Sequence, residues 1–413
     1  MMTYFIWGIS LLGLFIGIFW TQVVYAPEER KWKEQKEPTV SFLVPAWNEE
    51  KTLRKTIESI LNVDYPKEKI QIIIINDGSI DKTAEIATDL IIENHGKNIL
   101  LINRTRTPGQ FTKAPALNTG LKQVTGEYVA CLDSDSTIEP DSLKKIFEEF
   151  DEENVGAVIS AIKVANPVTI FGKIQRIEYI LATFVRKLMS KIDTLHVTPG
   201  ALSVYNTEIL NKIGKFDEKN ITEDYEIAVR LRYKGYRIKI QPDSISYTNV
   251  PETFKDMWDQ RVRWFRGFIT TSIKYKNMFA NKKFGMMGVF QYPINIISFI
   301  AIMFTFILFV YEGSKGAYNI TNKLSILGTG ILDLIKIPSL KSLLLHINIK
   351  VFFPITISLL VVIYLYYLAH KTQNEKWRHP LALLVYFTLY PPLRTAHWVT
   401  ATYKEILRKD KRW

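Results

Sequence analysis

Short apolar segments alternate with helix-like segments in the first third of the chain. Four runs rich in β-branched residues are each followed by a turn and then by a stretch with helical spacing. The run at residues 70–75 is nearly continuous, as in a strand buried on both faces. We therefore predict an α/β domain with a parallel sheet and right-handed crossovers, whose strands are residues 39–45, 70–75, 98–102 and 127–132.

Three longer stretches carry no charge and can cross a bilayer. Residues 4–26, 286–311 and 351–369 each reach the length of about 20 residues that a spanning helix needs. The first stretch lacks the basic start of a signal peptide and is longer than its usual apolar core, so we predict a retained anchor. Residues 381–402 are also apolar but contain Pro391-Pro392, Arg394 and His397. An arginine there either faces protein or water inside the membrane or extends to the interface.

The charges constrain the number of spans. If the α/β domain is cytoplasmic, four spans leave the basic tail at residues 404–413 outside, against the positive-inside rule. A further span near residues 326–347, or a re-entrant last segment broken at Pro391-Pro392, removes this conflict. The stretch 326–347 reads equally well as an interfacial helix, because it contains Asp333, Lys336 and Lys341. We predict four or five spans.

Composition adds a preference among partners. The 413 residues carry a formal net charge of +12, and Lys and Arg gather beside the apolar stretches. This placement favours anionic lipid headgroups over nucleic acid. The single cysteine, Cys131, excludes an intramolecular disulfide framework and a cysteine-based zinc site. We predict a membrane helix at 1–26, a cytoplasmic catalytic domain at 38–250, an interfacial amphipathic region at 251–284 and a membrane region at 285–413.

Acidic residues stand at the ends of two predicted strands, where ligands bind in parallel sheets. Asp77 precedes Gly78-Ser79 and is by itself most often a turn residue. Asp133 and Asp135 follow the strand 127–132 and, being two residues apart, can face the same cation. One or two carboxylates with phosphate oxygens are a usual magnesium site on a nucleotide. The competing interpretation of this pair is a helix cap before residues 141–150.

Two further motifs have both a structural and a chemical interpretation. Thr222-Glu223-Asp224 opens a helical pattern, where it is either a cap with acids favourable to the helix dipole or a general base. Gln260, Arg263 and Trp264 lie in a basic amphipathic stretch, 254–276, that suits a membrane surface. A stacking aromatic with an arginine equally suits a sugar and a diphosphate. The sequence has no P-loop, G-x-G-x-x-G or H-E-x-x-H motif, so kinase, dehydrogenase and zinc-hydrolase functions have no support.

The ordered set of Asp77, Asp133-Ser-Asp135, Thr222-Glu-Asp224 and Gln260-x-x-Arg263-Trp264 resembles the processive family-2 glycosyltransferases. These are the cellulose, chitin, hyaluronan and poly-N-acetylglucosamine synthases, and the last resemble this chain most in length and layout. The resemblance covers residues 38–270 and the flanking membrane helices. It implies a GT-A fold, a UDP-sugar donor and Mg²⁺ or Mn²⁺.

The resemblance also implies roles for individual residues. Glu49 in Pro45-Ala-Trp-Asn-Glu49 helps to hold the nucleoside, and Asp77 contacts uracil. Asp224 is the catalytic base with Glu223 beside it, and Asp135 binds the metal. The remaining assignments concern the substrates: Asp133 for the nucleotide, Lys113 beside the donor diphosphate, Gly200 in the acceptor-side loop at 198–205, and Gln260, Arg263 and Trp264 for the acceptor end and the diphosphate.

Three departures from the family pattern stand out. Thr112 replaces a glycine before Lys113, and the stretch 104–111 is longer and more basic than expected, so the donor-side loop can differ. Asn206 stands where many relatives have arginine, which puts acceptor contacts there in doubt.

The resemblance predicts a multi-pass enzyme of the cell membrane. It transfers sugar with inversion from a UDP-sugar, first UDP-N-acetylglucosamine, to a growing extracellular polysaccharide. The alternatives are a transferase that adds one sugar to a membrane lipid and, more remotely, an inactive sugar-nucleotide-binding scaffold. For the polysaccharide-forming enzyme, the expected partners are the UDP-sugar donor, a polysaccharide or lipid-linked acceptor and membrane lipids. An accessory membrane subunit stays an open alternative, and no nucleic acid is expected.

Overall fold

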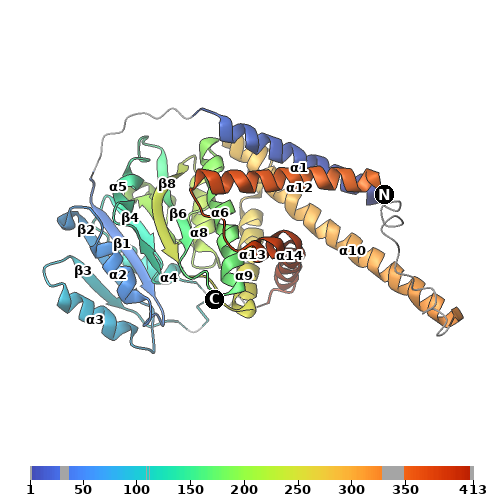
Figure 1. Ribbon diagram of the computed structural model, residues 1–413. Coiled ribbons are helices and arrows are strands. Elements are labelled where there is room, and N and C mark those ends of the chain that lie inside the picture. Colours follow the sequence, from blue (N-terminus) through green and yellow to red (C-terminus); the bar gives the residue numbers. More distant parts are fainter. Residues whose placement is uncertain (1, 28–36, 108, 111, 328–347, 410–413) are drawn as a thin grey trace. The chain divides into compact units, whose positions relative to one another are not determined.

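The computed structural model describes residues 2–27, 37–107, 109–110, 112–327 and 348–409 (Figure 1). The chain divides into two compact units. The larger unit comprises residues 28–293 and 372–413, and the smaller comprises residues 1–27 and 294–371.

The larger unit is built on one eight-stranded sheet with the order β3-β2-β1-β4-β7-β6-β8-β5. Strands β1 to β4 pair in parallel, as the alternation of strand and helix predicts. The sheet as a whole is mixed and not parallel, because β7 runs antiparallel to both β4 and β6, and β5 runs antiparallel to β8. The strands are β1 (Val40–Ala46), β2 (Ile70–Asn76), β3 (Ile99–Asn103), β4 (Tyr128–Leu132), β5 (Ser136–Ile138), β6 (Val155–Val164), β7 (Ala201–Asn206) and β8 (Arg237–Thr248).

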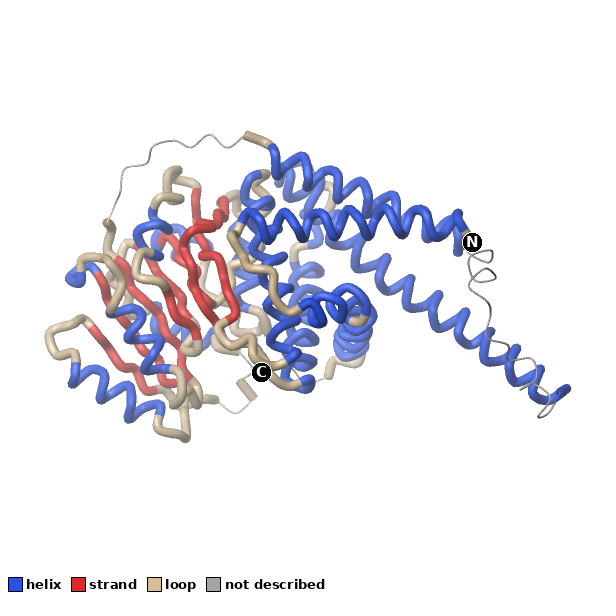
Figure 2. Tube along the Cα trace, in the orientation of Figure 1, coloured by secondary structure: helices blue, strands red, loops and turns tan. Residues whose placement is uncertain are grey.

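Helices cover both faces of this sheet (Figure 2). All seven residues of β2 are buried, and successive side chains enter opposite cores: Ile72 and Ile74 one, Ile73 and Ile75 the other. The first core is shared with α2 (Leu53–Leu61), α3 (Thr83–Glu93) and α5 (Ser142–Phe147). The second is shared with α4 (Ala114–Leu121), α7 (Thr207–Ile213) and α8 (Glu223–Tyr233).

Four more helices complete the larger unit. They are α6 (Ile170–Lys191), α9 (Phe254–Lys274), α13 (Pro380–Thr388) and α14 (Tyr390–Ile406). Trp398 of α14 stacks on Phe265 of α9, with ring centroids 3.9 Å apart. Short 3₁₀-helices lie at Lys67–Lys69, Lys276–Met278 and Lys282–Phe284, and a π-helical segment lies at Met287–Gln291.

The apolar stretch at 381–402 is divided and is not one spanning helix. Helix α13 has 9 residues and α14 has 17, so neither reaches the length of about 20 that a bilayer requires. The break falls at Leu389, and Pro391 and Pro392 occupy the first turn of α14, where proline is tolerated.

Three candidate membrane spans lie at Tyr4–Tyr25, Met287–Ile326 and Phe352–Thr372. The first and third lie within α1 (Met2–Tyr25) and α12 (Ile349–Thr372), and the second begins in the π-helical segment that leads into α10 (Tyr292–Leu327). The described residues thus offer three spans where the sequence predicts four or five. Of the further stretch considered at 326–347, residues 328–347 lie outside the described part of the chain.

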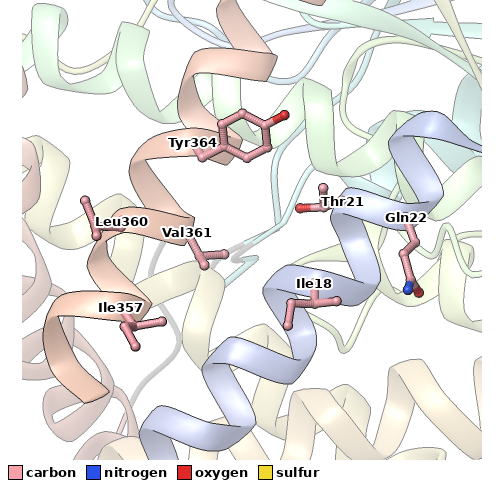
Figure 3. Close-up of a pocket in the computed structure, with 7 residues that line it drawn as sticks. All are labelled: Ile18, Thr21, Gln22, Ile357, Leu360, Val361 and Tyr364. Carbon is pink, nitrogen blue, oxygen red and sulfur yellow. The ribbon is translucent and has the colours of Figure 1, made fainter. Parts of the chain in front are cut away.

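Within the smaller unit, α1 packs closely against α12. The Tyr25 and Tyr364 hydroxyls are hydrogen-bonded at 2.8 Å, and the Ser358 hydroxyl donates to the Ser10 carbonyl at 3.1 Å. A Cβ at Gly17 would lie 2.2 Å from Val361, so this approach depends on glycine. An apolar groove lies beside this contact, as Figure 3 shows, and is lined by Ile18, Thr21, Gln22, Ile357, Leu360, Val361 and Tyr364.

Candidate active site

The predicted donor-side residues lie where three neighbouring parallel strands end. Glu49 follows β1, Asp77 follows β2, and Asp133 and Asp135 follow β4. The carboxyl ends of parallel strands share one edge of the sheet, and this edge is where ligands bind in open α/β sheets.

The Asp77 side chain is buried, and both of its carboxylate oxygens have partners in the basic stretch predicted at 104–111, here called the basic loop. Oδ1 is ion-paired with Arg104, and Oδ2 accepts a hydrogen bond from the Gln110 amide at 2.8 Å. The Arg106 guanidinium of the same loop lies 3.8 Å from the centre of the Trp47 ring, which belongs to the motif Pro45-Ala-Trp-Asn-Glu49 at the end of β1. The long basic loop therefore packs onto the residues predicted to hold the nucleoside.

Lys113 lies between Asp133, after β4, and Glu223, in the motif predicted to hold the catalytic base. Its ammonium is ion-paired with Asp133 and lies 3.7 Å from Glu223 Oε1. Burial opposes the charge of Lys113, yet the carboxylates of Asp133, Glu223 and Asp224 outweigh it and raise the pKa of the lysine. The preceding Thr112 accepts a hydrogen bond from the Ala114 amide at 3.2 Å, so it stabilises the start of α4 in place of the expected glycine.

Gly200 lies directly against this ion pair. A Cβ built there would be 2.3 Å and 2.4 Å from the two Asp133 carboxylate oxygens and 2.5 Å from Lys113 Nζ. No side chain fits at those distances, so the chain approaches the pair here only because residue 200 is glycine. The sequence predicts a loop at 198–205, but residues 201–205 belong to strand β7 and only residues 198–200 are a loop. The neighbouring Asn206, where relatives have arginine, caps α7 by accepting from the Ile209 amide at 3.0 Å.

Three carboxylates at this edge repel one another. Burial, the Asp133 carboxylate and the Glu49 carboxylate raise the pKa of Asp135 to about 7. Burial also raises the pKa of Glu49, and Asp133 adds to that effect. A divalent cation relieves such repulsion, and Asp133 and Asp135 fit the one or two carboxylates that Mg²⁺ takes beside phosphate oxygens. Within the described ranges, no cluster of three or more His, Cys, Asp or Glu side chains has the arrangement of a metal site.

The predicted base lies in the first turn of α8. The Asp224 carboxylate accepts a hydrogen bond from the Tyr225 amide at 2.8 Å, and the Thr198 hydroxyl donates to the Asp224 carbonyl at 2.7 Å. Glu223 is 2% exposed, and burial raises its pKa to about 7 although Lys113 opposes the shift. Both acids line one small cavity with Lys113, Asp133 and Gly200. The structure thus gathers the base motif and part of the donor motif around one space.

The predicted acceptor motif lies on α9, which packs against the start of α8. Gln260, Arg263 and Trp264 are half-buried, and the charge of Arg263 lowers the pKa of Glu223. A Cβ at Gly267 would be 1.9 Å from Thr222 Oγ1, so α9 and the base motif are in direct contact. The Asn220 amide also donates to Thr271 Oγ1 at 2.9 Å.

Sequence reasoning missed the partners of this motif. Arg261, inside the motif, is 1% exposed and pairs with Glu178 of α6 at 2.5 Å. Arg186, also on α6, has a buried Nη1 without a hydrogen-bond partner in the described part of the chain, and Asp224 is among the charges that act on it. The only signal in the sequence was the pair of arginines in the motif, since a buried arginine needs an acidic partner. Nothing in the sequence of α6 marked Glu178 as that partner or Arg186 as a neighbour of the site.

Comparison with known proteins agrees with this geometry. The family profile described as "Glycosyltransferase like family 2" matches residues 38–267. The chain belongs to this family. The family that the ordered motifs predict is therefore confirmed.

Two relatives of this glycosyltransferase are poly-beta-1,6-N-acetyl-D-glucosamine synthases. The protein of Staphylococcus epidermidis is 36% identical over 239 residues, which are 57% of this chain and 56% of that protein. The protein of Staphylococcus aureus is 31% identical over 316 residues, 73% of each chain. The first alignment thus spans little more than half of its relative's length.

The fold of the glycosyltransferase also occurs in a solved structure. A mannosyltransferase from Pyrobaculum calidifontis, in complex with GDP-Man and Mn²⁺, superposes with a TM-score of 0.64 at 20% identity, covering 98% of this chain and 96% of that one. This likeness supports the predicted GT-A fold.

Proposed function

We propose that this enzyme is a membrane-embedded polysaccharide synthase. It transfers N-acetylglucosamine with inversion from UDP-N-acetylglucosamine to the end of a growing polymer. The observation that carries the proposal is the direct packing of α9, with Gln260, Arg263 and Trp264, on the turn that holds Asp224. The names of the two staphylococcal relatives support N-acetylglucosamine as the transferred sugar and its polymer as the product.

The donor lies along the edge formed by β1, β2 and β4. Asp77 recognises the uracil base after exchanging its contacts with Arg104 and Gln110, and Glu49 helps to hold the nucleoside. Lys113 and Arg263 bind the diphosphate. Asp135, with Asp133, holds Mg²⁺ or Mn²⁺, which when bound offsets the negative charge of the diphosphate.

The reaction is one in-line displacement. Asp224 accepts the proton of the acceptor hydroxyl while the oxygen of that hydroxyl bonds to the anomeric carbon. The bond from the anomeric carbon to the diphosphate oxygen breaks, and UDP leaves with its electron pair. Because the hydroxyl attacks opposite the leaving UDP in a single step, the configuration of the anomeric carbon inverts. The cationic groups of Lys113 and Arg263 stabilise the charge that grows on the leaving group, and Glu223 beside Lys113 fixes that lysine.

The three candidate spans give a topology consistent with the charges. With the catalytic unit in the cytoplasm, the first span brings the chain in, the second leads it out and the third returns it. The basic residues at 404–413 are then cytoplasmic, as the positive-inside rule favours. Three spans remove the conflict that four spans create.

Product analysis tests the proposal. The full chain in lipid nanodiscs is incubated with radiolabelled UDP-N-acetylglucosamine, UDP-glucose or GDP-mannose and Mg²⁺ or Mn²⁺, and the products are sized. We expect a polymer from UDP-N-acetylglucosamine that is absent after addition of a chelator. If the only product is a lipid with one sugar, the enzyme is a single-sugar transferase and not a polysaccharide synthase. If no sugar is incorporated, both functions are contradicted.

A further inference from the structure

Arg261 is the largest side chain among the fully buried residues of the described structure. Its guanidinium is held from two other helices of the same unit. Glu178 of α6 pairs with Nη2 at 2.5 Å, Gln175 of α6 accepts from Nη2 at 3.2 Å, and Nε donates to the Tyr390 hydroxyl of α14 at 3.3 Å. The Tyr390 hydroxyl in turn donates to Glu178 at 3.0 Å. The charge is therefore buried, paired and fixed in direction.

The same guanidinium also contacts two residues of the predicted acceptor motif. Nη1 donates to Gln260 Oε1, and the guanidinium carbon lies 4.3 Å from the centre of the Trp264 ring. Arg261 thus occupies one face of the Trp264 ring and engages the carbonyl end of the Gln260 amide. The orientation of both side chains depends on a residue that is itself too buried to reach a substrate.

Stability alone does not require this arrangement. A buried ion pair gains little over apolar side chains of similar volume, because desolvating both charges offsets their attraction. What a charged pair adds is a defined direction, since an arginine with several fixed partners has one allowed position. Gln260 and Trp264 gain that fixed direction through their contacts with Arg261.

We propose that Arg261, Glu178 and Tyr390 are positioning residues for the acceptor site. They hold the Trp264 ring so that its second face stacks on the terminal sugar, and they turn the Gln260 amide nitrogen toward a sugar hydroxyl. This inference rests on the proposed function, because it takes Gln260 and Trp264 to bind the acceptor. It extends the acceptor site to α6 and α14, two helices outside the acceptor motif.

Steady-state kinetics with an added acceptor test the proposal. Glu178→Gln and Tyr390→Phe are made in the full chain in nanodiscs and assayed with UDP-N-acetylglucosamine and short β-1,6-linked N-acetylglucosamine oligosaccharides. We expect KM for the oligosaccharide to rise about tenfold in Glu178→Gln and less in Tyr390→Phe, with shorter polymers. UDP binding is expected to stay unchanged. Glu375→Gln is the matched control, because it removes the acid that pairs with Arg176 of α6, the helix that carries Glu178, while Glu375 itself lies between α12 and α13.

A double variant keeps the test decisive if Glu178→Gln fails to fold. Glu178→Leu with Arg261→Met removes both charges and leaves no unpaired ion, so folding is retained. A wild-type oligosaccharide KM and polymer length in this variant would overturn the positioning role. If instead the unmodified enzyme makes no polymer, the proposed function fails, and this outcome is distinguishable because it appears without any substitution.

Discussion

Asp224 and Glu223 are adjacent acids with different surroundings. Glu223 points into the Lys113 cluster, whereas Asp224 has one carboxylate oxygen bound only to its neighbouring amide among the recorded hydrogen bonds. If Asp224 is the base, as proposed, its removal should lower transfer by about 10²–10⁴-fold, the usual contribution of general base catalysis. We therefore expect Asp224→Asn to lose transfer in the radiolabel assay while its UDP affinity, measured by calorimetry, changes little.

Asp89→Asn is the control for this change, because Asp89 lies on the exposed face of α3. It should transfer at the wild-type rate. Near-normal turnover in Asp224→Asn would show that another group is the base.

Glu223 should also make stability depend on pH. Its pKa in the folded protein, about 7, lies above the value of 4.5 for an ordinary glutamate. The folded state therefore holds the proton more tightly, so this contribution is complete below about pH 4.5 and is lost as pH rises to about 7. We expect Glu223→Gln to raise the melting temperature relative to wild type more at pH 8 than at pH 5.

The measurement is a thermal scan of both proteins in the same nanodiscs at each pH. A difference between the two that does not grow from pH 5 to pH 8 would contradict the raised pKa.

Gly200 is the third residue with a testable role, because its surroundings leave no space for a side chain. Gly200→Ala places a methyl group within 2.5 Å of the Asp133–Lys113 pair, and such overpacking costs about 1–3 kcal/mol. The pair must separate, so we expect weaker UDP-N-acetylglucosamine binding and a large loss of transfer. Gly313→Ala, in a helical position with open space around it, should leave both unchanged. Normal donor affinity in Gly200→Ala would place the loop away from the donor.

At the scale of elements, the joint between α8 and α9 connects the base to the acceptor motif. Glycine inside a helix costs about 1 kcal/mol relative to alanine, yet Gly267 allows the contact with Thr222. Glu226, fully buried on α8, binds Lys274 at 2.7 Å and the Tyr275 hydroxyl at 2.6 Å, which fastens the far end of α9. The start of α8 is thus held to the C-terminal part of α9 at two places.

Opening that joint should impair the chemistry more than the fold. We expect Gly267→Ala to lower kcat strongly, because the new methyl group pushes Gln260 and Trp264 away from Asp224. Thr222→Ala removes the nearest atoms and should partly restore kcat in the double variant. Equal kcat in Gly267→Ala and wild type would show that the helices adjust without consequence for the site.

The sequence predicts some of these elements well, for reasons visible in single residues. The β-branched run at residues 70–75 predicts a buried strand, which β2 is, and the acids after it and after β4 lie at the carboxyl-end edge of the sheet as expected. The antiparallel direction of β7 was not predictable, because a strand's pattern of buried residues is the same in both directions. The break at Leu389 was signalled by Pro391-Pro392, but the pairing of Tyr390 with Arg261 depends on tertiary packing.

On the scale of the whole molecule, an odd number of spans places the two ends of the chain on opposite sides of the membrane. The only cysteine, Cys131, is buried, so introduced cysteines report their own location. The second candidate span has 40 residues, twice the length of about 20 that crosses a bilayer, so Lys323 near its end lies beyond the membrane core. We expect a membrane-impermeant maleimide to label Lys323→Cys in intact cells and to label Lys97→Cys and Lys409→Cys only after permeabilisation. Labelling of Lys409→Cys in intact cells would indicate an even number of spans.

The contact between α1 and α12 joins residues far apart in synthesis. Tyr25 and Tyr364 are separated by 339 positions, so at about 5–20 residues per second the first span waits roughly 20–70 seconds for its partner. During that interval the chain from β1 to α9 leaves the ribosome, whereas α13 and α14 of the same unit are made only after α12. A ribosome that stalls before α12 therefore leaves an unpaired anchor and a larger unit that lacks Tyr390 and Trp398, the partners of Arg261 and Phe265.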